Sequence, residues 1–262
     1  MMRMQKQRPG YTLVELLVVI TILVALAGLT LMLVPSAADR RAERGVTSVI
    51  GWLNIARQRA FRDQTPSGVR LYRDTDNKCR TVAYIMQPED LTSTSAVTVN
   101  ATNATIPAVF NGLVEVGDWL HLSETSQVYR FVGGGGTAFA LDRNAGLYTG
   151  NKYRIVRQPR PFAGEEPLQL PADVVIDLPV CLLPPPRPDG HIDLLFGPSL
   201  GLVGPTSSQG TVVLWVRTDP PAVSPEQGLI AIYSRTGRIA SFPVAPGADP
   251  YLFVKDGSAG GL

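Results

Sequence analysis

The sequence has few of the residues from which metal centres and disulfide frameworks are built. Its 262 residues include only two cysteines, Cys79 and Cys181, and two histidines, His121 and His191. A scaffold held by several disulfides is therefore excluded. We interpret the two histidines as structural or surface residues, and we expect neither a metal nor a cofactor.

An excess of charge is also missing. The chain carries 24 basic and 22 acidic residues, and three of the basic ones precede Gly10. A chain beginning at Tyr11 would hold 21 basic against 22 acidic residues, a net charge of −1. So balanced a composition offers no electrostatic footprint for nucleic acid, which we do not expect as a partner. The 45% content of hydrophobic residues argues against disorder.

The sequence lacks a complete catalytic motif. Gly197–Gly201 has the pattern G-x-S-x-G of a hydrolase, but that motif needs a helix directly after the serine and a histidine later in the chain. Gly204 and Pro205 follow closely, and both histidines precede Ser199. The glycines 133–136 lack the Lys-Ser/Thr of a phosphate loop and predict a hairpin tip. We predict no catalytic residues and no enzyme.

One long apolar run is present, Leu16–Val34, whose only polar members are Thr21 and Thr30. As a helix these 19 residues measure about 29 Å, enough to cross a hydrocarbon core. The run is too long for a cleavable secretory signal. A plain signal anchor would not explain Glu15, because a carboxylate in hydrocarbon costs about 2.5–3.5 kcal/mol on insertion scales. Glu15 is therefore a candidate functional residue.

The segment Arg8–Leu17 resembles the prepilin processing motif of type IV pilins and type II secretion pseudopilins. There a basic leader ends in glycine, an aromatic residue follows, and a glutamate comes four residues later. The resemblance implies that a prepilin peptidase cuts between Gly10 and Tyr11 and methylates the new amino group of Tyr11. It also implies a salt bridge between that ammonium and Glu15 of a neighbouring subunit. Tyr11 replaces the commoner phenylalanine.

Beyond the apolar run, the pattern predicts one helix and then strands. Apolar residues at spacings of three and four, Ala42, Val46, Val49, Leu53, Ala56 and Ala60, predict an amphipathic helix. Pro35 predicts a kink before it. Strands are expected at 69–72, 81–86, 192–197 and 211–217, and a hairpin is expected at 230–239.

The head sequence resembles the GspH/FimT family of minor pseudopilins, through Ala56–Leu71, Leu170–Asp177 and Ile230–Ile239. The fold class implied is α+β: a long N-terminal transmembrane and amphipathic helix packed on an antiparallel β-sheet head, pilin-like, with a β-rich insertion. Within the insertion, 91–105 is expected to be a loop, followed by strands. The expected parts are a leader (1–10), a transmembrane helix (11–34), its amphipathic extension (35–64), the head (65–86 and 159–262) and the insertion (87–158).

The resemblance implies a minor pseudopilin, a structural subunit of a type II secretion-like pseudopilus. The alternative is a type IV minor pilin acting in pilus assembly, adhesion or DNA uptake. Expected partners are other pseudopilin or pilin subunits, the prepilin peptidase and inner-membrane lipid. The basic leader predicts a single pass with a cytoplasmic N-terminus and an extracytoplasmic head. In such a compartment Cys79 and Cys181 could pair, and two unpaired thiols are the alternative.

Overall fold

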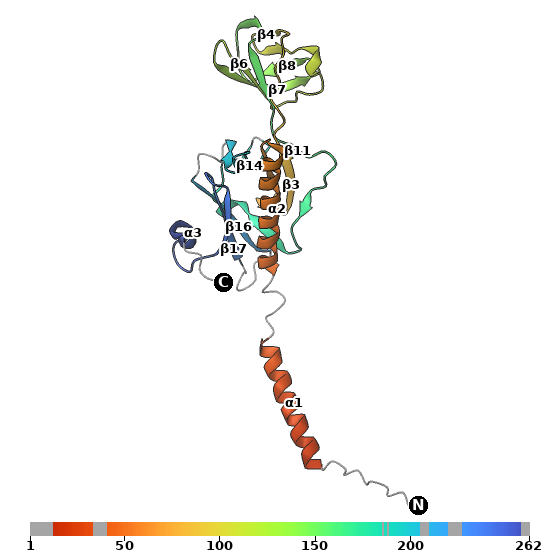
Figure 1. The fold of residues 1–262 in the computed structure, drawn as a ribbon, viewed down its shortest axis with the longest axis vertical. Helices are drawn as coiled ribbons and strands as arrows, with labels where there is room; N and C mark the ends of the chain where they lie inside the picture. The colour runs from red at the N-terminus through yellow and green to blue at the C-terminus, as the bar shows by residue number, and fades with distance from the viewer. Residues whose placement is uncertain are drawn as a thin grey trace, which may run out of the picture. The chain divides into compact units, whose positions relative to one another are not determined.

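The computed structural model describes residues 13–33, 41–184, 186–187, 189–204, 210–219 and 227–257. The chain divides into two compact units, Met1–Arg40 and Arg41–Leu262. The first contains helix α1 (Leu13–Leu33), shown in Figure 1. Gly10, Tyr11 and the kink expected at Pro35 lie outside the described residues. The continuity of the two predicted helices therefore stays a prediction.

The second unit begins with helix α2 (Arg41–Asp63), which is amphipathic as predicted. One stripe of its surface is buried, and it consists of Ala42, Gly45, Val46, Val49, Leu53, Ala56 and Ala60. Gly45 was not part of the predicted stripe. A Cβ at this position would lie 2.5 Å from a methyl group of Val174, so glycine allows the helix to approach the sheet closely.

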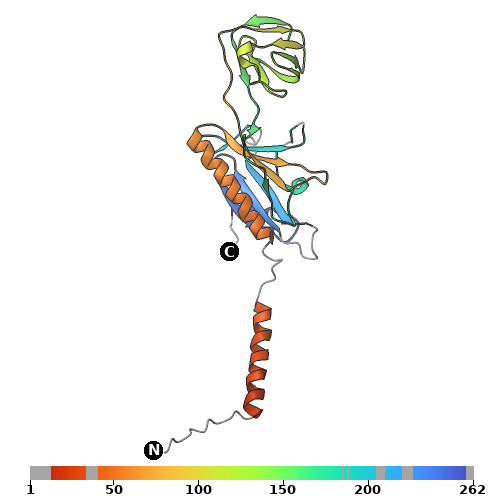
Figure 2. The same ribbon diagram turned by 90° about the vertical axis from the view of Figure 1, so that its right-hand side faces the viewer.

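Helix α2 packs against two antiparallel sheets of the head (Figure 2). The first has the order β11-β3-β1-β14-β15, with β12 also paired to β3, and the second has the order β18-β17-β16-β13-β2. The α+β, pilin-like fold class is thus confirmed, as are the strands and the hairpin expected in the head. The bounds are β1 (Ser67–Tyr72), β2 (Lys78–Cys79), β3 (Thr81–Met86), β11 (Arg160–Pro161), β12 (Leu168–Gln169), β13 (Val174–Asp177), β14 (Ile192–Phe196), β15 (Leu202–Val203), β16 (Thr211–Thr218), β17 (Gln227–Tyr233) and β18 (Arg238–Pro243).

The head has one main core and a smaller one. The main core joins the buried stripe of α2 to both sheets, with Leu53, Leu194 and Leu214 among its fully buried members. The smaller core includes Val213, Leu229 and Val254. Val254 belongs to helix α3 (Leu252–Asp256), which the sequence analysis missed because five residues are too few to show a helical period. Alternate residues of β16 thus enter different cores.

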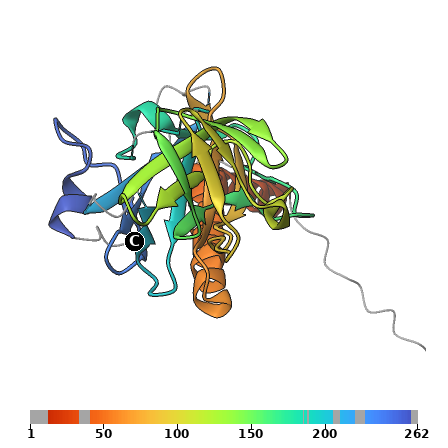
Figure 3. The same ribbon diagram turned by 90° about the horizontal axis from the view of Figure 1, so that it is seen from above.

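A third, seven-stranded sheet is built from residues between β3 and β11, in the order β10-β6-β7-β8-β5-β4-β9. Its strands are drawn in yellow and green in Figure 3. They carry a separate core that includes Leu120, Phe131 and Ile155. We call this part the insertion sheet. Its strands are β4 (Val97–Asn100), β5 (Asn103–Thr105), β6 (Trp119–Leu122), β7 (Gln127–Gly135), β8 (Ala138–Leu141), β9 (Leu147–Gly150) and β10 (Tyr153–Val156), and a 3-10 turn, η1, spans Ala108–Phe110.

The expected loop at 91–105 was wrong, because it contains β4 and β5. Val97 and Val99 are buried while Thr98 and Asn100 are exposed, so the alternation of a strand is present. The many Ser, Thr and Asn residues around it concealed that alternation. The hairpin expected at glycines 133–136 is confirmed, since Gly133–Gly135 pair with β8 and Gly136 lies in the turn.

Candidate functional site

The surface of α1 is apolar over the residues whose side chains are described. Eleven large apolar side chains between Leu13 and Leu26 are 48–80% exposed. Burying an aliphatic side chain gains about 1.5–3 kcal/mol, so such a surface favours lipid or another apolar helix over water. A helix that is apolar on all sides is typically buried, either in a protein core or in a membrane. Over its described side chains, helix α1 therefore presents an apolar surface for association.

Two polar side chains interrupt this surface. The Thr21 hydroxyl donates to the Leu17 carbonyl oxygen at 2.8 Å, so the helix itself satisfies it. Glu15 is exposed and lies in the first turn of α1, where a negative charge is favoured by the helix dipole. Glu15 is also the only charged residue of α1. The glutamate singled out by sequence thus lies at the N-terminal end of an otherwise apolar surface.

No helix in the described part of the chain is long and apolar enough to span a membrane.

A network of polar side chains connects the head to the insertion sheet. Arg70 donates to both carboxylate oxygens of Asp193, at 2.6 and 2.8 Å, and to the Pro159 carbonyl oxygen at 2.9 Å. Arg187 donates to Asp193 at 2.6 Å and also to the side-chain oxygen of Gln158. Arg70 is buried on β1, so the head contributes a desolvated, paired charge at this point.

On the insertion side, the network centres on Asp118, which is fully buried. Its carboxylate accepts from the backbone nitrogens of Glu115 at 2.9 Å and Gln158 at 2.8 Å, and from Arg160 at 2.9 Å. Neighbouring Gly117 has φ +102°, and a Cβ there would lie 1.7 Å from the Gln158 side chain. The backbone nitrogen of Gln158 donates to Asp118 of the insertion, and its side-chain oxygen accepts from Arg187 of the head. Gln158 thus connects the two parts. Sequence reasoning missed this network because its members are up to 123 residues apart.

Both cysteines are thiols in the structure. Cys79 donates to the Thr81 carbonyl oxygen at 3.2 Å, and Cys181 to that of Asp177 at 3.1 Å. The backbone nitrogen of Trp215 donates to the Cys181 sulfur at 3.1 Å. Burial raises the pKa of each thiol to about 12, so both stay protonated at neutral pH.

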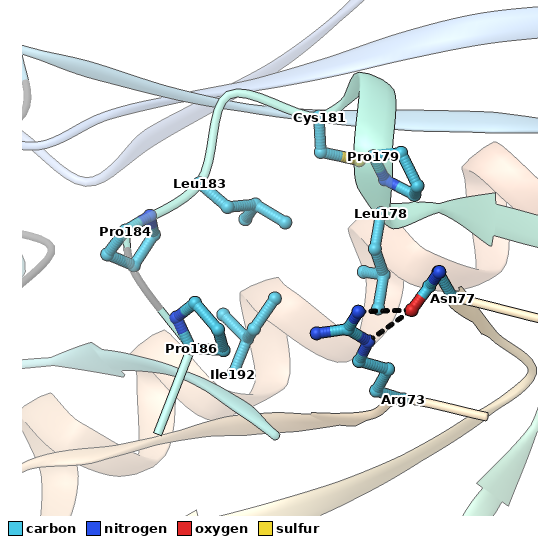
Figure 4. A pocket seen from close by; sticks show the side chains of 9 residues that line it. All are labelled: Arg73, Asn77, Leu178, Pro179, Cys181, Leu183, Pro184, Pro186 and Ile192. Atoms are coloured by element: carbon cyan, nitrogen blue, oxygen red, sulfur yellow. Dashed lines mark hydrogen bonds between the residues drawn. The ribbon is translucent and has the colours of Figure 1, made fainter. Parts of the chain in front are cut away.

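A cavity of about 460 Å³ lies beside Cys181 (Figure 4). Leucine, isoleucine and proline side chains form most of its wall, and the Arg73 guanidinium is held there by Asn77 at 2.6 Å. The described residues of the lining include no carboxylate or histidine and so offer no acid–base pair. No group of three or more candidate metal ligands occurs among the described residues.

The other residues weighed from sequence are not brought together. His191 stacks edge-on against Tyr72 with ring centroids 4.8 Å apart, and His121 lies on β6 in the insertion sheet. Ser199 occupies a turn that leads into strand β15, where a hydrolase nucleophile would need a helix. Nothing at Ser199 therefore has the form of a nucleophile elbow.

Residues 5–31 match the family described as the prokaryotic N-terminal methylation motif. No curated protein and no solved structure matches the chain. The matched range includes Gly10, Tyr11 and Glu15 and ends within α1. Proteins with this motif are typically membrane-anchored structural subunits. The chain thus carries the prepilin-type methylation motif, which implies a pilin-like protein matured by a prepilin peptidase and assembled with other pilins.

Proposed function

We propose that this chain is a minor pseudopilin of the GspH/FimT type, a structural subunit of a type II secretion-like pseudopilus. The observation that carries the proposal is the motif at residues 5–31 on an apolar helix, followed by a helix packed on antiparallel sheets. An apolar anchor joined to a compact head suits a subunit that is stored in a membrane and added to a filament. The energy of assembly then comes from a separate motor.

In this proposal, the prepilin peptidase removes residues 1–10 and methylates the amino group of Tyr11. Residues 11–34 then span the inner membrane, with the N-terminus in the cytoplasm and the head outside. The basic residues Arg3, Lys6 and Arg8 support this orientation by the positive-inside rule. Residues 35–64 extend the helix to the head, which comprises 65–86 and 159–262. Residues 87–158 are an insertion that carries the third sheet.

Glu15 has a defined role in this proposal, as the partner of the Tyr11 ammonium of the next subunit. When α1 helices pack together, a charge without a counterion would be buried among apolar side chains. Removing one partner of a buried ion pair costs about 3–5 kcal/mol. The pair therefore sets the axial stagger between subunits, because only one register brings the two charges together.

The test is Glu15→Gln, which keeps the shape of the side chain and removes its charge. Insertion and cleavage should be intact, because removing a charge from an apolar run makes insertion easier. Incorporation should fall at least tenfold, measured as co-purification with partner pseudopilins after crosslinking, beside an assay of cleavage at Gly10. Glu43→Gln, in the first turn of α2, is the matched control and should behave as the wild type.

Wild-type incorporation of the Glu15→Gln subunit would contradict the salt-bridge role. Recovery of an uncut N-terminus from cells with active prepilin peptidase would contradict the whole proposal. The identity of the co-purifying partner also distinguishes a subunit of a secretion pseudopilus from a subunit of a type IV pilus. Pseudopilins and a secretion channel support the first, whereas pilins and retraction components support the alternative, a type IV minor pilin.

A further inference from the structure

The fold brings the only two cysteines of the chain to the same part of the main core. Cys79 ends β2, which pairs with β13 so that Cys79 faces Ile176. The 3-10 turn η2 (Leu178–Val180) follows β13 directly, and Cys181 is the next residue. Strand β2 contacts η2. Residues 102 positions apart in sequence are thereby placed on adjoining elements.

The surroundings of the two cysteines also indicate that they lie near one another. The Cys181 sulfur lies 3.1 Å from the Asp177 carbonyl oxygen, and Asp177 pairs with Lys78, the neighbour of Cys79. Cys79 is completely buried, and Cys181 is partly buried, packs against the same core and lies next to Pro179 in Figure 4. Burial is the main cause of the raised pKa of Cys181, and the negative charge of an ionised Cys79 adds to it. Because the chain has two cysteines, each thiol is the one intramolecular partner with which the other can form a disulfide.

We propose that Cys79 and Cys181 form an intramolecular disulfide that ties β2 to the end of η2. The proposal rests on the extracytoplasmic head of the proposed function, where a disulfide carrier acts as oxidant. One cysteine thiolate attacks the carrier disulfide and forms a mixed disulfide, and the second thiolate displaces the carrier. The protein loses two hydrogen atoms, and the carrier leaves as a dithiol. Oxidation occurs during folding, since burial keeps the folded thiols protonated.

The bond would close the chain around β3, the whole insertion sheet and β13. Constraining so long a loop reduces the entropy of the unfolded chain, so reduction should lower the melting temperature by about 5–10 °C. The disulfide would fasten β2, the edge strand of the second head sheet, to the turn that follows β13. This consequence concerns stability and makes no use of the motif at residues 5–31.

The test uses the full chain, isolated from cells and solubilised in detergent. Thiols are blocked with maleimide under denaturing conditions, and the peptides are mapped by mass spectrometry with and without reductant. We expect a linked Cys79–Cys181 peptide pair that separates on reduction. Finding both cysteines alkylated here and also after the refolding described below, or linked between two chains, would overturn the proposal.

Three variants, Cys79→Ala, Cys181→Ala and the double substitution, separate a covalent bond from simple packing. If a disulfide is present, the melting temperature falls by the same amount in each single variant, and it falls little further in the double variant. Additive losses that persist in reductant would indicate packing alone and contradict the proposal.

A second experiment refolds the same chain in a glutathione redox buffer. It distinguishes failure of the cysteine site from failure of the proposed function. A disulfide that forms there but not in the sample isolated from cells supports the cysteine site and contradicts the extracytoplasmic location of the head. Failure in both samples overturns the cysteine site, whatever the location.

Discussion

At the scale of single residues, Asp118 is the most constrained side chain of the junction. It is fully buried, and its three hydrogen bonds reach two backbone nitrogens and Arg160. A buried carboxylate is tolerated only with such compensation. The asparagine amide could accept at one oxygen only, and its NH2 group would face donors.

We therefore expect Asp118→Asn to lower the free energy of unfolding of the insertion sheet by about 3 kcal/mol. The measurement is urea unfolding followed by hydrogen exchange of peptides from 97–156. Glu124→Gln is the matched control, because Glu124 forms an exposed ion pair with Lys152 at 3.5 Å and should change stability by less than about 1 kcal/mol. Equal effects of the two substitutions would contradict the central position of Asp118.

Asp219 gives the head a pH dependence of known sign. Hydrogen bonds from Lys78 at 2.8 Å and Arg80 at 2.6 Å hold the pKa of Asp219 below its ordinary value. A depressed folded-state pKa contributes stability above the unfolded pKa of about 3.9, and this contribution is lost as pH falls through the folded value.

Asp219→Asn should therefore destabilise the head at pH 7 by about 1–2 kcal/mol, and this difference from the wild type should shrink below pH 4. Thermal melts across this pH range measure it. Asp76→Asn, on the exposed turn between β1 and β2, serves as the control. A difference that stays constant down to pH 2.5 would show that the ion pairs are not its source.

At the scale of elements, α2 is stabilised by its packing and less by its own propensity. Its buried stripe contacts strands of both head sheets, so a defect in the stripe affects the whole head. Leu53 is completely buried near the middle of the helix, whereas Ile55, two residues on, is 42% exposed. The two positions share a helix and differ in burial.

Leu53→Ala should lower the free energy of unfolding of the head by about 2–5 kcal/mol, because it removes buried methyl groups and leaves a cavity. Ile55→Ala should cost much less. Chemical denaturation of both variants, monitored by circular dichroism, makes the comparison. A larger loss at Ile55 would mean that the helix packs by a different face.

At the scale of the whole second unit, the main core of the head and the core of the insertion sheet are joined by a polar connection. Among the residues that the structure describes, the main head core and the insertion core have no member in common. The described contacts between them include the bonds of Gln158 to Arg187 and Asp118. Since cooperativity follows shared burial, the insertion sheet and the head should unfold separately.

We expect hydrogen exchange in rising urea to give two midpoints, one for peptides of 97–156 and another for peptides of α2, β16 and β17. Asp118→Asn should move only the first midpoint. A single midpoint for all peptides would show that the junction couples the two cores into one cooperative unit.

The sequence by itself determined the features that depend on local periodicity or on a contiguous motif. These are the apolar run with Glu15, the amphipathic stripe of α2 and the main strands of the head, because a helix or strand that buries one face must repeat its apolar residues at a fixed spacing. The match at residues 5–31 is likewise a property of adjacent residues. None of these needs a distant part of the chain.

Only the tertiary structure decided which distant residues meet. It placed Arg70 beside Asp193, Gln158 between Arg187 and Asp118, and Cys79 on the strand next to η2. It also showed β4, β5 and α3, whose short patterns compete with the turn residues around them. The physical reason is that a polar contact across a fold has no period in sequence, and its partners are set by how the sheets pack.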